Sequence, residues 1–309
     1  MVLYSESRFL KLTRRIYNKA QRVCPAYSSK FSKKTYTQHQ HITILCLRKW
    51  LKQDYRDTVE LIAEMPRIQE LLELEQILDY TTLCKAFERL SKLVFVVLLE
   101  LTLPNGLPRT YGIDATGLTR NHVSSHYAKQ CKIRIKSMKT TFLVNSDTQL
   151  IAGIHTTTTR KHDSKIILPV VGRSPHHIDT LIGDKGYDDN KVREALKSVG
   201  IKPVIPYREC TELDKLANCK LDKRTYSKRV FNETVNSSIK RKYGDELVSR
   251  HWRNQQKEVY LMCILHNSER LISVIWEGFQ QSHLKNKSKI YKSICTGSPC
   301  SFSSGCEIC

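Results

Sequence analysis

The stretch RTYGIDATG, residues 109–117, is a short run of β-favouring residues that carries Asp114 at its close. A second such run, IDTLIGDKGYDD at residues 178–189, places Asp184 just past an apolar pair, with a glycine-bearing turn behind it. Apolar and β-branched residues bounded by Gly and Asp are typical of strands that end in turns. The sequence therefore predicts two strands, each ending close to an aspartate.

The segments around these two runs predict an alternating α/β pattern. Segments rich in Thr, Val and Ile favour strands, and apolar residues at helical spacing favour helices. A glycine just past the last apolar residue favours a helix end there. The expected elements are a hairpin over 140–158 around Ser146-Asp147, a helix over 164–171 capped by Asp163 or Ser164, a helix ending at Gly200, and a strand over 201–207.

A basic stretch at residues 224–244, RTYSKRVFNETVNSSIKRKYG, predicts a late helix with two different faces. At about 100° per residue, one face carries the signature Y-x2-R-x3-E-x6-K within roughly 60°. The signature residues are Tyr226, Arg229, Glu233 and Lys240, and the expected buried face carries Phe231, Val235 and Ile239. A carboxylate between two cations on a core-packed helix suits a metal and a phosphate. Two aspartates upstream complete a possible three-carboxylate site.

Taken together, these motifs resemble the DDE transposases of prokaryotic insertion sequences, in the class with a Tyr-Arg-Glu-Lys signature. The resemblance covers about residues 35–275, and includes HYAKQCKIRIKSMK before the second strand and SRHWRNQQKEVYLMCILHN after the glutamate helix. It implies a ribonuclease-H-like catalytic domain, with a mixed five-stranded sheet flanked by helices and an N-terminal all-helical domain. The expected boundaries are 1–105 for a basic arm and helical DNA-binding domain, 106–280 for the catalytic domain and 281–309 for a disordered Cys-rich tail.

The chemistry expected of such a site is metal-dependent phosphoryl transfer. Three neighbouring carboxylates repel one another unless a cation neutralises them, and oxygen-only ligands select Mg²⁺ or Mn²⁺ over zinc. Two such ions about 3.5–4 Å apart would support in-line displacement at a phosphate. The predicted catalytic and metal-binding residues are Asp114, Asp184 and Glu233, and the predicted DNA-binding residues are Tyr226, Arg229, Lys240, Lys136 and Lys139.

The resemblance further implies that the enzyme cleaves element ends and joins the freed 3′-hydroxyls to target DNA. The expected partner is therefore DNA, both terminal inverted repeats and target, with a homodimer in the synaptic complex. Some relatives carry a long β-rich insertion before the glutamate. Only 48 residues separate Asp184 from Glu233 here, so the hairpin-forming excision associated with that insertion is not expected.

The charge of the chain agrees with a polyanionic partner. It has 51 Lys and Arg against 30 Asp and Glu, a net charge of +21, which is typical of proteins that contact phosphates. Residues 1–50 hold eleven Lys and Arg and a single acid, whereas residues 51–100 hold six and ten. We expect a DNA-contacting arm followed by a packed helical module, with helices over 53–64, 66–74 and 81–93, the last capped by Thr81-Thr82.

Other interpretations of the same residues remain open. A single strand-end aspartate is more often a turn or cap residue, and a glutamate between cations is more often a surface ion pair worth about 0–1 kcal/mol. The N-terminal helices could be a scaffold or dimer surface without base contacts. A metal-dependent nuclease on the same fold, or a catalytically inactive DNA-binding relict, are the alternative functions.

The remaining features of the sequence point to a cytoplasmic, nucleoid-associated protein with no membrane contact. The N-terminus lacks an apolar signal region, and the longest apolar run, LVFVVLLELTL at residues 93–103, is too short to span a bilayer. That run predicts the end of a buried helix or a core strand. The histidines are expected not to bind metal, namely His122, His126, His176 and His177. The C-terminal cysteines favour a disordered tail over a zinc site, namely Cys295, Cys300, Cys306 and Cys309.

Overall fold

The computed structural model describes residues 6–120, 137–159 and 161–295 of the 309-residue chain, with side chains as far as residue 273. Six residues singled out above lie outside these ranges: Lys136, His122, His126, Cys300, Cys306 and Cys309. The chain divides into two compact units, Met1–Glu269 and Arg270–Cys309. Helix α13 (Trp252–Cys295) begins in the first unit and supplies the described part of the second. The tail expected from residue 281 is therefore helical as far as Cys295.

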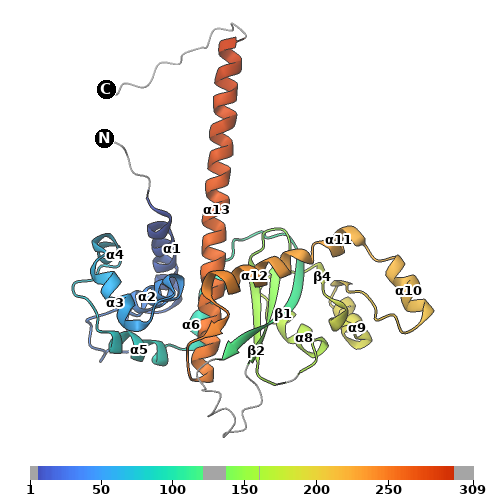
Figure 1. Cartoon of the computed structure of the whole chain (residues 1–309), viewed down its shortest axis with the longest axis horizontal. Helices are drawn as coiled ribbons and strands as arrows, with labels where there is room; N and C mark the ends of the chain where they lie inside the picture. The colour runs from blue at the N-terminus through green and yellow to red at the C-terminus, as the bar shows by residue number, and fades with distance from the viewer. Residues whose placement is uncertain (1–5, 121–136, 160, 296–309) are drawn as a thin grey trace. The chain divides into compact units, whose positions relative to one another are not determined.

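The first unit contains one mixed sheet with the strand order β3-β2-β1-β4-β5 (Figure 1). Strands β1 and β2 and strands β2 and β3 pair antiparallel, whereas β4 and β5 continue the sheet in parallel with β1. The strand bounds are β1 Thr110–Arg120, β2 Ser137–Asn145, β3 Ile151–Thr157, β4 Thr180–Ile182 and β5 Lys202–Val204. All five expected strands are confirmed, but β1 runs past Asp114, which therefore lies in the middle of the strand.

A short sixth strand, β6 (Glu246–Leu247), pairs with the end of β1 and was not predicted. Two residues are too few to produce an alternating pattern, so no sequence signal marked it.

Different helices cover the two faces of the sheet. Helix α12 (Val230–Tyr243) packs on one face, where Asn232 meets Gly112 of β1. Helix α8 (Ser164–Val171) packs on the other, where Val170 meets Gly153 of β3, and α9 (Asn190–Ser198) packs beside β5. This three-layer mixed α/β arrangement is ribonuclease-H-like, as the sequence predicts.

Helix ends confirm some of the expected caps and correct others. Helix α9 ends next to Gly200, which has a φ of +80°, as predicted. Asp163 directly precedes α8, but its side chain makes no capping bond. Helix α5 is capped by Asp79 and not by Thr81-Thr82. The Asp79 side chain accepts the backbone N–H of Thr81.

Six helices form the N-terminal region, and the packing starts earlier in the chain than expected. Helix α2 is almost wholly buried, including the side chains of Lys49 and Arg48, so this part of the expected basic arm is a packed helix. The apolar run at 93–103 forms helix, not strand. The bounds are α1 Arg8–Val23, α2 Gln38–Leu51, α3 Tyr55–Ala63, α4 Pro66–Leu71, α5 Tyr80–Arg89 and α6 Lys92–Leu101.

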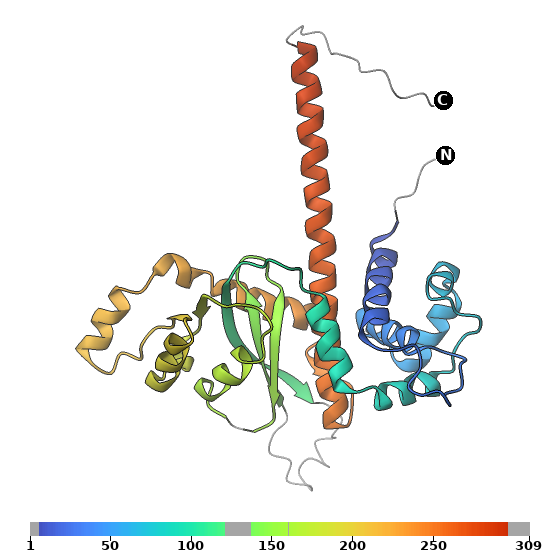
Figure 2. The ribbon, with the colours of Figure 1, turned by 180° about the vertical axis from the view of Figure 1, so that it is seen from behind.

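The first part of α13, up to Glu269, lies between the N-terminal helices and the sheet (Figures 1 and 2). On one side the Lys257 ammonium donates to the C-terminal carbonyls of α5, those of Phe87 and Leu90. On the other, Gln256 Nε2 donates to Thr156 Oγ1 of β3, 2.8 Å away. This segment of α13 therefore joins the two parts of the first unit. No helix among the described residues is long and apolar enough to cross a membrane.

Candidate active site

The three predicted acids come from two neighbouring strands and the helix that covers them. Asp114 lies on β1, and Asp184 follows the end of β4 by two residues. The parallel register pairs Gly112 with Ile182, so continuing it by two residues brings Asp114 level with Asp184. Glu233 lies in the first turn of α12, which packs on β1.

A close contact between α12 and β1 brings the helix to the acid. A Cβ atom added at Gly112 would lie 2.2 Å from Asn232 Nδ2, so only glycine leaves room for this buried side chain. One turn later, Asn236 Nδ2 donates to Asp114 Oδ2 at 2.8 Å. The helix that carries Glu233 is therefore tied directly to the strand that carries Asp114.

The Arg229 guanidinium lies between the two acids that are open to solvent. Its Nη2 is 2.9 Å from Glu233 Oε1, and its Nη1 is 3.9 Å from Asp184 Oδ1. The acid side chains are about half exposed, 50% for Asp184 and 52% for Glu233, so solvent screens these pairs and they add little to stability. The two ion pairs instead hold the positive charge of Arg229 between Asp184 and Glu233.

Asp114 is partly buried and lies within the electrostatic influence of the other two acids. Burial raises the pKa of Asp114, and the nearby charges of Glu233 and Asp184 raise it further. The Ala115 N–H and Arg229 act in the opposite direction without reversing the shift. Asp114 is therefore harder to ionise than a free aspartate, because it is partly buried and because two other carboxylates lie nearby.

Asp184 also serves a local structural purpose. Its side chain accepts the backbone N–H of Lys185 at 2.8 Å and caps the short turn Lys185–Tyr187. The simpler interpretation, a strand-end aspartate that caps a turn, therefore holds as well. The interactions with Arg229 and Asp114 show that this cap residue also faces the acid cluster.

The signature residues do not lie on one continuous helix, contrary to the prediction. The stretch breaks into α11 (Lys223–Ser227) and α12, with Arg229 at the junction. Tyr226 belongs to α11, and its ring centroid is 6.0 Å from the Arg229 guanidinium. Burial raises the pKa of Tyr226, and the acids Asp184 and Glu233 add to this effect, so the phenol faces the same cluster.

Two further details of the expected helix differ. Phe231 is 37% exposed and does not join the buried face. Val235 and Ile239 are buried as predicted, together with Asn232, Asn236 and Tyr243. Lys240 lies two turns beyond Glu233, half-buried, with no ion pair to the described residues.

Lys139 lies on the opposite face of the sheet from Asp114. Residues paired across antiparallel strands share a face, and successive residues alternate. Asp114 pairs with Phe142, so Lys139, three residues away, points to the α8 side. There its ammonium forms an ion pair with Asp163. The structure therefore does not bring Lys139 to the three acids.

Sequence reasoning missed Asn232 and Asn236, the two asparagines on the buried face of α12. Asn232 is 1% exposed and its side-chain atoms find no hydrogen-bond partner among the described residues. The available signal was their spacing: four residues apart, each in line with the apolar residues of the buried face. Polar residues at such positions indicate a specific contact.

The donor set suits a hard divalent cation. It consists of carboxylate oxygens alone, and the pKa of Asp114 is raised chiefly by burial and further by the charges of Glu233 and Asp184. Within the described residues, however, no three acidic, His or Cys side chains are close enough to form a metal site as they stand. Arg229 separates Asp184 from Glu233, so it must shift before both acids can share an ion.

A mixed sheet of this topology, with acids gathered from β1, β4 and the facing helix, defines the ribonuclease-H-like class. A family model described as Transposase DDE domain matches residues 106–268, more than half of the chain. The chain therefore belongs to the DDE transposase family and acts on DNA. A comparison with curated proteins found no match.

Proposed function

We propose that this transposase cuts DNA at the ends of an insertion sequence and joins the freed 3′-hydroxyls to target DNA. Asp114, Asp184 and Glu233 are the catalytic carboxylates in this proposal. The observation that carries it is their convergence around Arg229, with Asn236 linking α12 to Asp114. Hydrolysis supplies the 3′-hydroxyl, and its attack on a target phosphodiester releases another 3′-hydroxyl, so both steps balance without a further reactant.

The three carboxylates would hold two Mg²⁺ or Mn²⁺ ions. Such ions supply charge neutralisation at the phosphate and activation of the attacking oxygen. The residues contribute geometry: β1 and β4 keep two acids side by side, and α12 brings the third from the facing layer. Asn236 holds Oδ2 of Asp114 and so fixes the orientation of this carboxylate.

Tyr226, Arg229 and Lys240 are proposed to bind the DNA backbone beside the acids. Arginine and lysine make charge-assisted contacts with phosphate oxygens. Arg229 is 29% exposed and pairs only with partly exposed acids, so a phosphate can compete for it. Its transfer from the acids to the DNA would open the site to cations.

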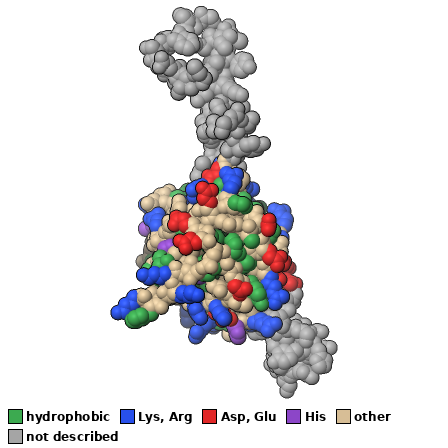
Figure 3. Space-filling view, turned by 90° about the vertical axis from the view of Figure 1, so that its left-hand side faces the viewer, with side chains coloured by type: hydrophobic (Ala, Val, Ile, Leu, Met, Phe, Trp, Pro, Cys, Tyr) green, Lys and Arg blue, Asp and Glu red, His purple; other side chains and the backbone are tan. Residues whose placement is uncertain are grey.

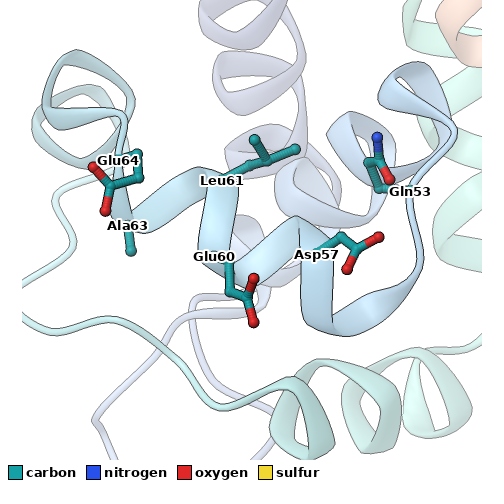
Figure 4. A pocket seen from close by; sticks show the side chains of 6 residues that line it. All are labelled: Gln53, Asp57, Glu60, Leu61, Ala63 and Glu64. Carbon is teal, nitrogen blue, oxygen red and sulfur yellow. The ribbon is translucent and has the colours of Figure 1, made fainter.

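The N-terminal helices are proposed to bind the terminal inverted repeats, in a complex of two protomers. Five of the exposed cations of this region lie on α1 and on the loop that follows it: Arg14, Arg22, Lys30, Lys33 and Lys34. Others are spread over the later helices, where acids alternate with them. One part of the region is unsuited to phosphate. An open depression of about 600 Å³ along α3 is lined by Asp57, Glu60 and Glu64 (Figure 4).

The side of the molecule seen in Figure 3 likewise mixes Asp and Glu with Lys and Arg. DNA contact by this region is therefore expected on the α1 side, away from the acids of α3.

The test uses purified protein, a duplex carrying an element end, and Mg²⁺. Asp114→Ala should abolish end cleavage, a loss of at least about 1,000-fold, while binding to the duplex persists. The control is Asp57→Asn on α3, which should cleave at the wild-type rate. Retained cleavage in Asp114→Ala contradicts the assignment.

The products separate the alternative functions. Strand-transfer product with wild-type protein supports a transposase. Cleavage without transfer indicates a nuclease, and binding without cleavage indicates a relict.

A further inference from the structure

One buried carboxylate, that of Glu269, joins three helices far apart in the sequence. Its side chain is only 4% exposed. Oε1 accepts the indole N–H of Trp50 on α2 at 2.8 Å and lies 3.5 Å from Arg8 of α1. Oε2 lies 2.5 Å from the Lys242 ammonium and accepts the hydroxyl of Tyr243, both on α12.

These contacts connect the N-terminal region to the helix that carries Glu233. Tyr243 ends α12, and Glu233 lies ten residues earlier, about 15 Å along a helix that moves as a stiff rod. A second link supports the same connection: Lys52 Nζ, at the end of α2, donates to the Arg241 carbonyl of α12 at 3.2 Å. A displacement of α2 is therefore transmitted to the end of α12 and to its acid.

A second buried acid on α13, Glu258, makes fewer links between helices than Glu269 does. Glu258, eleven residues earlier on α13, pairs with Lys49 of α2 at 2.7 Å. It also accepts the backbone N–H groups of Val248 and Ser249. Glu258 thus fastens α2 to α13, whereas Glu269 fastens α2 to α13 and to α12 at once.

We propose that Glu269 is a positioning residue that sets α12, and with it Glu233, relative to the N-terminal helices. A DNA end held by those helices is then presented to the acids in one fixed geometry. This inference rests on the proposed function, since it assumes that end cleavage depends on Glu233.

The test removes single hydrogen bonds to Glu269 and keeps the rings in place. Tyr243→Phe and Trp50→Phe are compared in single-turnover cleavage of an element-end duplex, with the Kd for the same duplex measured in parallel. Each should slow cleavage about tenfold, the effect of roughly one hydrogen bond to a charged group, and change the Kd less than about twofold. The double variant should lose less than the product of the two effects, because both bonds act through one carboxylate.

Two controls separate positioning from general loss of stability. Tyr80→Phe removes a hydroxyl that accepts a hydrogen bond from the Arg56 guanidinium at 3.2 Å between α5 and α3, away from α1 and far from Glu269 in the chain, and should cleave at the wild-type rate. Unfolding in urea gives the folded fraction of each variant. Wild-type cleavage in Tyr243→Phe and Trp50→Phe overturns the proposal, as does a loss that only follows the folded fraction.

Two further variants are included, one as a replacement for a variant that does not fold and one to test the proposed function separately. If Trp50→Phe does not fold, Glu269→Gln, which retains one acceptor oxygen, takes its place under the same criteria. Asp114→Ala is run alongside: if it cleaves normally, the proposed function fails, whereas inactive Asp114→Ala with fully active Tyr243→Phe overturns only the role of Glu269.

Discussion

Asn236 is the side chain of α12 that contacts the carboxylate of Asp114. Its amide donates to Oδ2 at 2.8 Å, and the residue is 9% exposed, so water does not readily replace it. A buried polar side chain that contacts a proposed catalytic acid controls orientation as well as stability. At this scale, one amide links the first turns of α12 to β1.

Removing that amide should impair the reaction more than the fold. Asn236→Ala should lower single-turnover cleavage about tenfold and destabilise the protein by about 1 kcal/mol in urea unfolding. Asn236→Asp should lose more activity, because it places a second carboxylate against Asp114. Equal activities of Asn236→Asp and wild type would exclude a role for this contact.

The packing of α12 on β1 is decided at the scale of elements by one glycine. Gly112 allows Asn232 to enter between helix and strand, and the helical stretch is interrupted at Lys228-Arg229, between α11 and α12. The position of Glu233 therefore follows from a close backbone approach. The hydrophobic pattern of the helix alone does not fix it.

Gly112→Ala should push α12 away from the sheet. The added methyl group would overlap the buried Asn232 side chain, so we expect a destabilisation of about 1–3 kcal/mol, measured by urea unfolding. Gly117→Ala is the matched control on the same strand, since its nearest neighbour would be 3.9 Å away. Adding Asn232→Ala to Gly112→Ala removes the overlapping atoms and should restore part of the stability; no recovery would contradict this account.

At the scale of the whole first unit, α13 holds the N-terminal helices and the sheet together through charged side chains. Burial alone would raise the pKa of Glu258 and of Glu269. Lys49 and backbone N–H groups lower the pKa of the first, and Lys242, Trp50 and Tyr243 lower that of the second, so both end below their ordinary value. Each carboxylate is therefore ionised and satisfied in the folded protein.

This arrangement predicts a loss of stability in acid. A carboxyl group whose pKa is lowered by folding stabilises the native state above its unfolded pKa, near 4.5, and the contribution disappears as pH falls through the lower folded value. The urea midpoint should therefore fall steadily below about pH 5. Glu258→Gln or Glu269→Gln should be less stable at pH 7 and show a flatter acid dependence, whereas the exposed Glu64→Gln should behave as wild type. A midpoint that rises between pH 7 and pH 4 would contradict this role.

Local sequence patterns predicted most elements of the catalytic region. Strands β1 to β5, the hairpin at Ser146-Asp147 and the helix end at Gly200 each depend on residues close in the chain. The three acids occur in the order of their elements, β1, β4 and α12. The parallel pairing of β1 with β4 brings Asp114 level with Asp184. The family match confirms the DDE transposase family that these motifs indicated.

The contacts between elements were not predictable in the same way. The break at Arg229, the position of Lys139 on the far face, the contact of Asn236 with Asp114 and the three-helix contact of Glu269 all depend on side chains distant in sequence. A helical wheel assumes one straight helix, and a charge count assigns no face to a lysine. The helix is in fact interrupted at Arg229, and Lys139 lies on the face away from the acids, so neither method could place these residues.

By itself, the sequence determined the α/β class, the order of the acids along the chain and the positive net charge that suits a DNA partner. Only the tertiary structure decided which side chains meet: Arg229 between two acids, Gly112 beneath Asn232, and Glu269 between the N-terminal helices and α12. The physical reason is that strand and helix formation depend on short-range periodicity, whereas contacts between elements depend on register, close approach and the pairing of buried charges.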